Sequence, residues 1–190
     1  MEHGRTLRHL LELGKLNRNF YFMEQTLIIL KPDTVMRGII GEVITRFERV
    51  GFKIVGMKML EPGYDHYYEH YEGIGTLKTR KGDEIFEGTL SSMQDGPVIA
   101  MVLEGVEAVD AVRKMVGDTQ PKTALPGTIR GDYAHVTYGQ ASEVGKGVAN
   151  VLHASADVNE AKKEIKHWFT PEEMFTYTAV HEEFTQPRKK

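Results

Sequence analysis

The chain of 190 residues contains no cysteine, which excludes disulfide bonds and thiolate metal sites. No apolar run approaches the roughly 20 residues that a membrane-spanning helix needs. Basic residues are not in excess, because 24 Lys and Arg stand against 27 Asp and Glu, a net charge of -3. Broad attraction to nucleic acid is therefore not expected, and an anionic ligand would need a few focused cations. We expect a cytoplasmic protein with no nucleic-acid or membrane partner.

The length fits one domain with its own apolar core. Residues 1–22 differ from the rest: they are mildly basic, and Glu12 and Gly14 interrupt their apolar run, so a signal peptide is not expected. We therefore expect a dispensable N-terminal extension over residues 1–22, a domain over residues 23–180 and a polar tail over residues 181–190.

Four segments are typical of strands because they are apolar or alternate in polarity. They are Thr26–Leu30, Phe52–Leu60, Val98–Leu103 and Tyr133–Tyr138. Helical spacing of apolar residues lies between them, and the order of segments predicts a β-α-β-β-α-β arrangement with additional helices. The sequence thus favours an α+β sandwich with one sheet.

Helix boundaries are marked by local signals. Asp33 or Thr34 can cap a helix whose apolar stripe continues to Val50, and Gly51 ends it. Asp157, with Glu160 three residues later, predicts the start of a helix over Val158–Trp168. Residues 117–131 and 139–149 are rich in small and polar residues, so both are predicted as loops.

Two motif-like stretches are weak. Gly139 to Lys146 resembles a P-loop, but five residues separate its glycines and no Ser or Thr follows the lysine. His66 and His70 match an H-x-x-E-H zinc pattern without a clear third ligand. A metal hydrolase built on these two histidines remains an alternative, and packing is the more ordinary explanation for them.

His153 has the most suggestive setting. It follows an apolar run, and Glu164 lies eleven residues later in a helical stretch. A carboxylate that holds one ring nitrogen makes the other nitrogen a better nucleophile. The other seven histidines are interpreted as structural or solvated: His3, His9, His66, His70, His135, His167 and His181.

Scattered cations could hold phosphates near such a histidine. Lys31 ends an apolar strand, where it could reach a ligand or lie in solvent, and Arg113 could equally be a surface arginine. Arg130 is more specific, because glycines bracket it and Asp132 could orient its guanidinium. Asn150 offers an amide three residues before His153.

Together these segments resemble the nucleoside diphosphate kinase family over about residues 23–177. The segments that carry the resemblance are Leu30–Gly38, Gly96–Gly105, Pro126–Asp132, Asn150–Ser155 and the helix with Glu164, followed by Trp168-Phe169 and Pro171-Glu172-Glu173. Their combination and order are very specific.

The resemblance implies a ferredoxin-like core with a four-stranded antiparallel sheet, assembled as a homohexamer or tetramer. It implies transfer of the γ-phosphate of ATP to other nucleoside diphosphates by a ping-pong mechanism, with His153 as phosphoryl acceptor and Glu164 and Lys31 assisting. Mg²⁺ would bridge the phosphates with few or no protein ligands. The positions implied to contact nucleotide are Lys31, Tyr71, Ile85, Arg113, Thr119, Arg130 and Asn150.

The chain departs from the family pattern at a few places. Ile85 stands where an aromatic is usual, Ala149 and Ala156 replace an arginine and an acid, and the stretch from Asp132 to His153 is longer than usual. Ile85 predicts weaker stacking on the base. These departures leave a competing interpretation, a non-enzymatic regulator that keeps the pocket as a binding module, although such a protein would not need His153.

Overall fold

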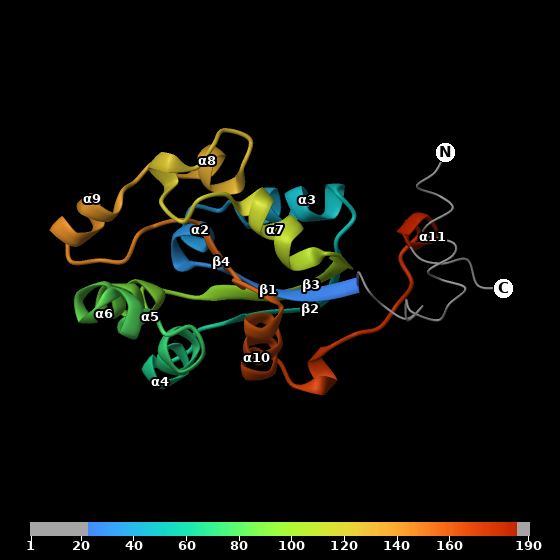
Figure 1. Cartoon of the computed structure of the whole chain (residues 1–190), viewed down its shortest axis with the longest axis horizontal. Helices are drawn as coiled ribbons and strands as arrows, with labels where there is room; N and C mark the ends of the chain where they lie inside the picture. Colours follow the sequence, from blue (N-terminus) through green and yellow to red (C-terminus); the bar gives the residue numbers. More distant parts are fainter. Residues whose placement is uncertain (1–22, 186–190) are drawn as a thin grey trace, which may run out of the picture.

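The computed structural model describes residues 23–185, so the predicted extension 1–22 and residues 186–190 of the predicted tail lie outside the described residues (Figure 1). The described elements, in chain order, are β1 (Met23–Leu30), α2 (Pro32–Met36), α3 (Ile40–Arg49), β2 (Lys53–Leu60), α4 (Tyr64–Tyr68), the π-helix η1 (Glu69–Ile74), α5 (Leu77–Lys81), α6 (Asp83–Met93), β3 (Val98–Val106), α7 (Ala108–Val116), η2 (Pro121–Thr123), α8 (Ile129–Tyr133), α9 (Tyr138–Glu143), β4 (Leu152–Ala154), α10 (Val158–Trp168), η3 (Pro171–Glu173) and α11 (Glu182–Thr185).

The four strands form one sheet in the order β2-β3-β1-β4. All three pairings are antiparallel, and β1 and β3 pair along their length from Met23 opposite Val106 to Leu30 opposite Ile99. This confirms the predicted α+β class and the four-stranded antiparallel ferredoxin-like sheet.

Helices cover both faces of the sheet, which explains why the central strands are continuously apolar. In β1, Leu27 and Ile29 face one core with α4, α6 and α10, while Ile28 and Leu30 face the other core with α3 and α7. The period of two along a strand sends these neighbours to opposite faces. Figure 1 shows α3 and α7 above the sheet and α10 and α4 below it.

The predicted single helix after Asp33 is two helices, α2 and α3. Gly38 separates them with φ of 69°, a left-handed conformation that interrupts helical hydrogen bonding. The apolar stripe continued across this break, so periodicity alone did not reveal it. The short α2 leaves the end of β1 directly beside the segment that precedes β4, since Lys31 N donates to Val151 O at 3.0 Å.

The prediction of a fourth strand over Tyr133–Tyr138 is wrong, and the fourth strand is β4. Thr128 caps α8 instead, because its hydroxyl accepts a hydrogen bond from Gly131 N at 3.1 Å. Tyr133 belongs to that helix, so the alternation that follows it does not form a ladder. β4 pairs with β1 over three residues, and so short a run gave little periodic signal.

The predicted loop over residues 139–149 also contains a helix, α9, which begins at Tyr138. Thr137 caps it by accepting a hydrogen bond from Gln140 N at 3.1 Å. We call residues 137–148 the inserted segment. Across the described residues, no helix has the length and apolar character needed to cross a membrane.

We predict that Thr128→Ala lowers the free energy of unfolding by about 1 kcal/mol, the usual cost of losing a helix N-cap. Thr128→Ser, which keeps the capping oxygen, should lose much less. Urea unfolding followed by circular dichroism measures both variants. Equal stability of the alanine and serine variants would show that the cap does not hold α8.

Candidate active site

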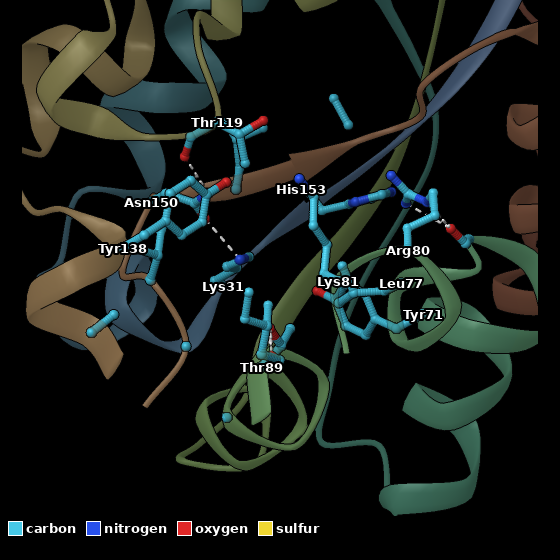
Figure 2. Close-up of a pocket in the computed structure, with 18 of the residues that line it drawn as sticks. Lys31, Tyr71, Leu77, Arg80, Lys81, Thr89, Thr119, Tyr138, Asn150 and His153 are labelled. Atoms are coloured by element: carbon cyan, nitrogen blue, oxygen red, sulfur yellow. Dashed lines mark hydrogen bonds between the residues drawn. The ribbon is translucent and has the colours of Figure 1, made fainter. Parts of the chain in front are cut away.

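All nine predicted site residues line one cavity of about 1170 Å³ (Figure 2). They are Lys31, Tyr71, Ile85, Arg113, Thr119, Arg130, Asn150, His153 and Glu164. The cavity lies where β1, β4 and α10 meet α6 and the loop after α7. Segments far apart in the sequence therefore meet around one volume that is large enough for a nucleotide.

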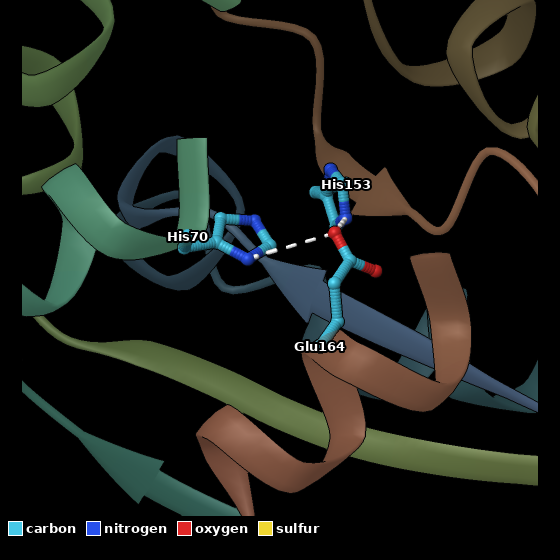
Figure 3. Close-up of side chains that lie close together, drawn as sticks. All are labelled: His70, His153 and Glu164. Carbon is cyan, nitrogen blue, oxygen red and sulfur yellow. Dashed lines mark hydrogen bonds and ion pairs between the residues drawn. The ribbon is translucent and has the colours of Figure 1, made fainter. Parts of the chain in front are cut away.

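A buried carboxylate holds the imidazole of His153. Glu164 is 1% exposed, and its Oε1 lies 2.7 Å from His153 Nε2 (Figure 3). A carboxylate can only accept here, so Nε2 carries the proton. Nδ1 is then the unprotonated nitrogen with a free lone pair.

The other oxygen of the Glu164 carboxylate is occupied by Ser155. The serine hydroxyl donates to Oε2 at 2.5 Å and accepts from Leu27 N at 3.1 Å. Ser155 is completely buried. Both bonds fix the carboxylate, and they leave the serine oxygen unsuited to accept a phosphoryl group.

His70 also belongs to this site, which the sequence did not indicate. Its ring lies edge-on to His153 with centroids 4.5 Å apart, and its Nδ1 is 3.6 Å from Glu164 Oε1 (Figure 3). Trp168 Nε1 donates to Nδ1 at 3.2 Å, and burial lowers the pKa of His70 well below its usual range. The ring is therefore neutral, and its contact with Glu164 is not an ion pair.

His70, His153 and Glu164 place potential metal-ligand atoms within 4.8 Å of one another, close enough to share one ion. Hydrogen bonds already engage Glu164 Oε1 and His70 Nδ1. His66 does not join them, because its ring stacks on His167 with centroids 4.0 Å apart. The zinc pair of His66 and His70, which the sequence left open as an alternative, therefore does not form in the described residues.

Lys31, directly after β1, lines the cavity and is the first member of a chain of hydrogen bonds. Its Nζ donates to Asn150 Oδ1 at 2.7 Å, and Asn150 Nδ2 donates to Thr119 O at 2.8 Å. Burial, with a smaller effect of Arg130, lowers the pKa of Lys31 to about 8 against the opposing effect of Asp33. Within the described residues, no carboxylate forms an ion pair with this lysine.

Arg130 is buried and bonded to backbone carbonyls. It donates to Asn150 O at 3.0 Å, Leu152 O at 2.7 Å and Gly117 O at 3.0 Å. Burial lowers its pKa to about 10, which still leaves it charged at neutral pH. Two of these carbonyls, those of Asn150 and Leu152, belong to the segment that leads to His153, so Arg130 positions β4. No carboxylate of the described chain forms an ion pair with its guanidinium. Such a buried charge favours an anionic ligand.

Asp132 does not orient Arg130, contrary to the sequence prediction. Its carboxylate pairs with Arg46 at 2.7 Å and accepts from Gly127 N at 2.7 Å. Gly131 allows the same loop to pack closely, since a Cβ at this position would lie 2.1 Å from Leu125 O. The glycines and the aspartate of this motif therefore shape the turn that presents Arg130.

The backbone before His153 is strained. Val151 has φ of 72°, a left-handed conformation that β-branched residues rarely adopt. Asp33 and Thr34 hold it there, because Val151 N donates to Asp33 Oδ2 at 3.2 Å and Val151 O accepts from Thr34 Oγ1 at 2.5 Å. Asp33 and Thr34 thus fix the turn that positions His153.

The remaining predicted residues lie on the cavity walls. Tyr71 packs edge-on to His153 with centroids 6.2 Å apart, and its buried hydroxyl has no hydrogen-bond partner within the described part of the chain. Arg113, which is exposed, donates to Ser155 O at 3.4 Å. Ile85 on α6 is 36% exposed and supplies no ring.

Other lining residues were not identified from the sequence. They include Leu77, Arg80 and Lys81 on α5, and Tyr138 on the inserted segment (Figure 2). The unusual length between Asp132 and His153 was the only available signal for Tyr138.

Comparison with known proteins identifies the family of this chain. A family model described as "Nucleoside diphosphate kinase" matches residues 24–174. The nucleoside diphosphate kinase of Pyrococcus furiosus is 44% identical over 172 residues, which are 88% of this chain and 96% of that protein.

Solved structures match as well. A structure of the Borrelia burgdorferi nucleoside-diphosphate kinase, described as a transition state mimic with bound vanadate and ADP, has a TM-score of 0.82 and 39% identity and covers 86% of this chain and 96% of its own. An NDP kinase from Pyrobaculum aerophilum has a TM-score of 0.73 and 36% identity and covers 81% of this chain and 100% of its own. The chain belongs to the nucleoside diphosphate kinase family and is an enzyme that transfers a phosphoryl group from a nucleoside triphosphate to a nucleoside diphosphate.

Proposed function

We propose that His153 carries the phosphoryl group between two nucleotides in a ping-pong reaction. The Nδ1 lone pair attacks the γ-phosphorus of ATP, the bond from that phosphorus to the β–γ bridging oxygen breaks, and ADP leaves. A terminal oxygen of a second nucleoside diphosphate then attacks the phosphohistidine and restores the free ring. The observation that carries this proposal is the 2.7 Å contact between Nε2 and Glu164, which leaves Nδ1 as the nucleophile.

Charge neutralisation is the second requirement of phosphoryl transfer, because negative charge is spread over the phosphate oxygens. Lys31, Arg113 and Arg130 line the same cavity as His153 and have no carboxylate partner among the described residues. We assign the phosphates to these three cations. The ADP and vanadate bound by the Borrelia burgdorferi relative support this assignment.

The neutral polar groups suit the rest of the nucleotide. The buried Tyr71 hydroxyl has no hydrogen-bond partner among residues 23–185 and suits a phosphate oxygen beside His153. Asn150 and Thr119 lie beside Lys31 and suit the sugar and the inner phosphate. Ile85 contributes apolar surface to the wall beside the base.

We also propose that Mg²⁺ accompanies the nucleotide. When bound, it supplies positive charge to phosphate oxygens, and it prefers oxygen ligands. Asp118, a carboxylate of the cavity wall next to Thr119, already accepts a hydrogen bond from Gln120 N at 2.8 Å. The residues present therefore fit an ion held mainly by the phosphates, without a dedicated set of protein ligands.

Self-association as a hexamer or tetramer is a further part of the proposal. β2 is an edge strand, and its Met57 and Met59 are 53% and 57% exposed. Exposed apolar side chains on a sheet edge favour pairing with another surface. A cytoplasmic location stays a prediction.

We predict that His153→Ala abolishes phosphoryl exchange and leaves the fold intact, because no other described group holds a free lone pair beside Glu164. A coupled ATP–diphosphate exchange assay and circular dichroism measure the two properties. The native protein incubated with ATP alone should carry acid-labile phosphate, and the variant should carry none.

His135→Ala is the matched control, since this exposed histidine lies outside the cavity. It should retain full exchange. Retained turnover by His153→Ala, or acid-stable phosphate on the native protein, would contradict the assignment.

The lowered pKa of Lys31 predicts a pH dependence. The ammonium is charged below its pKa of about 8 and neutral above it, so kcat/KM for nucleotide should fall as pH rises through about 8. Lys31→Arg should remove this descending limb, because a guanidinium does not titrate in that range. An unchanged limb in the arginine variant would assign it to another group.

A chain that begins at Met23 should retain exchange activity and oligomeric mass. β1 starts at this residue, and its pairing with Val106 is complete without anything that precedes it. Exchange assays and size-exclusion chromatography with light scattering compare the shortened and full chains. Loss of activity would give residues 1–22 a functional role, and a monomeric mass in both chains would refute the proposed assembly.

A further inference from the structure

The nucleotide cavity contains one well-exposed aromatic ring that no predicted role includes. Among the residues that the structure describes, its lining has two tyrosines and no phenylalanine or tryptophan. Tyr71 is 9% exposed and packs beside His153, whereas Tyr138 is 42% exposed. A ring that stays this exposed on a cavity wall is available to a ligand.

Tyr138 lies across the cavity from the apolar wall that includes Leu77 on α5. Figure 2 shows it with Asn150 and Thr119 on one side and Leu77 and Tyr71 on the other, with Lys31 nearer the middle. Asn150, whose side chain accepts from Lys31 at 2.7 Å, lies on the same side of the cavity as Tyr138, so we expect a nucleotide whose sugar lies at this pair to present its base to the tyrosine ring.

The backbone of Tyr138 is held in place before any ligand arrives. Tyr138 N donates to Gln120 Oε1 at 3.1 Å, and Lys122 N donates to Val136 O at 3.3 Å. Tyr138 is also the first residue of α9, directly after the capping Thr137. A fixed backbone limits the positions that the ring can take, which lowers the entropic cost of binding a ligand.

The far end of the inserted segment is fastened to α6. Gly147 N donates to Gly88 O at 2.8 Å and to Ser92 Oγ at 2.8 Å, and Lys146 pairs with Asp95 at 2.6 Å. α6 also carries Ile85. These bonds therefore tie the segment that supplies the tyrosine to the helix that lacks the ring at position 85.

We propose that Tyr138 is the aromatic residue on which the nucleobase of a bound nucleoside diphosphate or triphosphate stacks, opposite the apolar wall that contains Leu77 and Ile85. This inference rests on the proposed binding of nucleotide phosphates near His153. Stacking tolerates every base, because each has an aromatic face. The inserted segment thereby replaces the ring that position 85 does not provide.

The test measures binding separately from transfer. In full-length protein that carries His153→Ala, Tyr138→Ala should raise the Kd for ADP about tenfold, which is about 1.4 kcal/mol. The Kd for inorganic triphosphate, which has no base, should not change. Tyr138→Phe should bind ADP as the parent does, since it keeps the ring.

Tyr64→Ala is the matched control, because Tyr64 is 40% exposed on α4 and lies outside the cavity. It should leave both Kd values unchanged. Three outcomes would overturn the proposal: unchanged ADP binding by Tyr138→Ala, an equal loss for both probes, or a loss in Tyr138→Phe as large as in the alanine variant. Failure of the parent to bind either probe would instead refute the nucleotide site itself.

Discussion

The contact between the Glu164 carboxylate and His153 Nε2 is the interaction on which the site depends. It fixes the tautomer, so the nitrogen that faces away from the carboxylate is the one with a lone pair. The contact exists because α10 places Glu164 beneath the edge strand β4, where Ser155 holds the second carboxylate oxygen at 2.5 Å. One buried carboxylate thus links the packing of a helix on the sheet to the reactivity of an imidazole.

The edge strand itself needs support, since it forms only a three-residue ladder with β1. Arg130 supplies part of this support through the carbonyls of Asn150 and Leu152, and Asp33 and Thr34 supply more by holding Val151. Residues that would serve a bound phosphate therefore also hold the histidine in place. Substituting Arg130 should therefore alter both the proposed phosphate binding and the position of His153. Loss of activity in such a variant would not identify Arg130 as a substrate contact.

The sequence predicted the part of this arrangement that depends on motif and periodicity. The three longer strands follow from runs that are apolar or alternate in polarity, and the nine cavity residues follow from the local setting of a few side chains together with the family resemblance. β4 was missed because three residues give no period, and α8 and α9 were missed because Thr128 and Thr137 start them within polar, glycine-rich sequence. His70 could not be distinguished from the other histidines, since its place beside Glu164 depends on how η1 packs against α10.

The buried Lys53 and the half-buried Lys31 have opposite pKa shifts, because only Lys53 has carboxylate partners among the described residues. Lys53 is 7% exposed and pairs with Glu104 at 2.7 Å and Glu182 at 2.8 Å. Burial opposes its charge, but these carboxylates outweigh burial and raise its pKa. Lys31 has an asparagine as its side-chain partner and no carboxylate among the described residues, so burial prevails and its pKa falls to about 8.

The same contrast applies to Arg130, whose partners are neutral carbonyls. Leaving buried cations without carboxylates costs stability, because their desolvation is not offset within the chain. In the proposed function, a phosphate bound at these cations recovers that free energy as binding. Lys31 and Arg130 are then destabilising without a ligand for the same reason that they suit a phosphate.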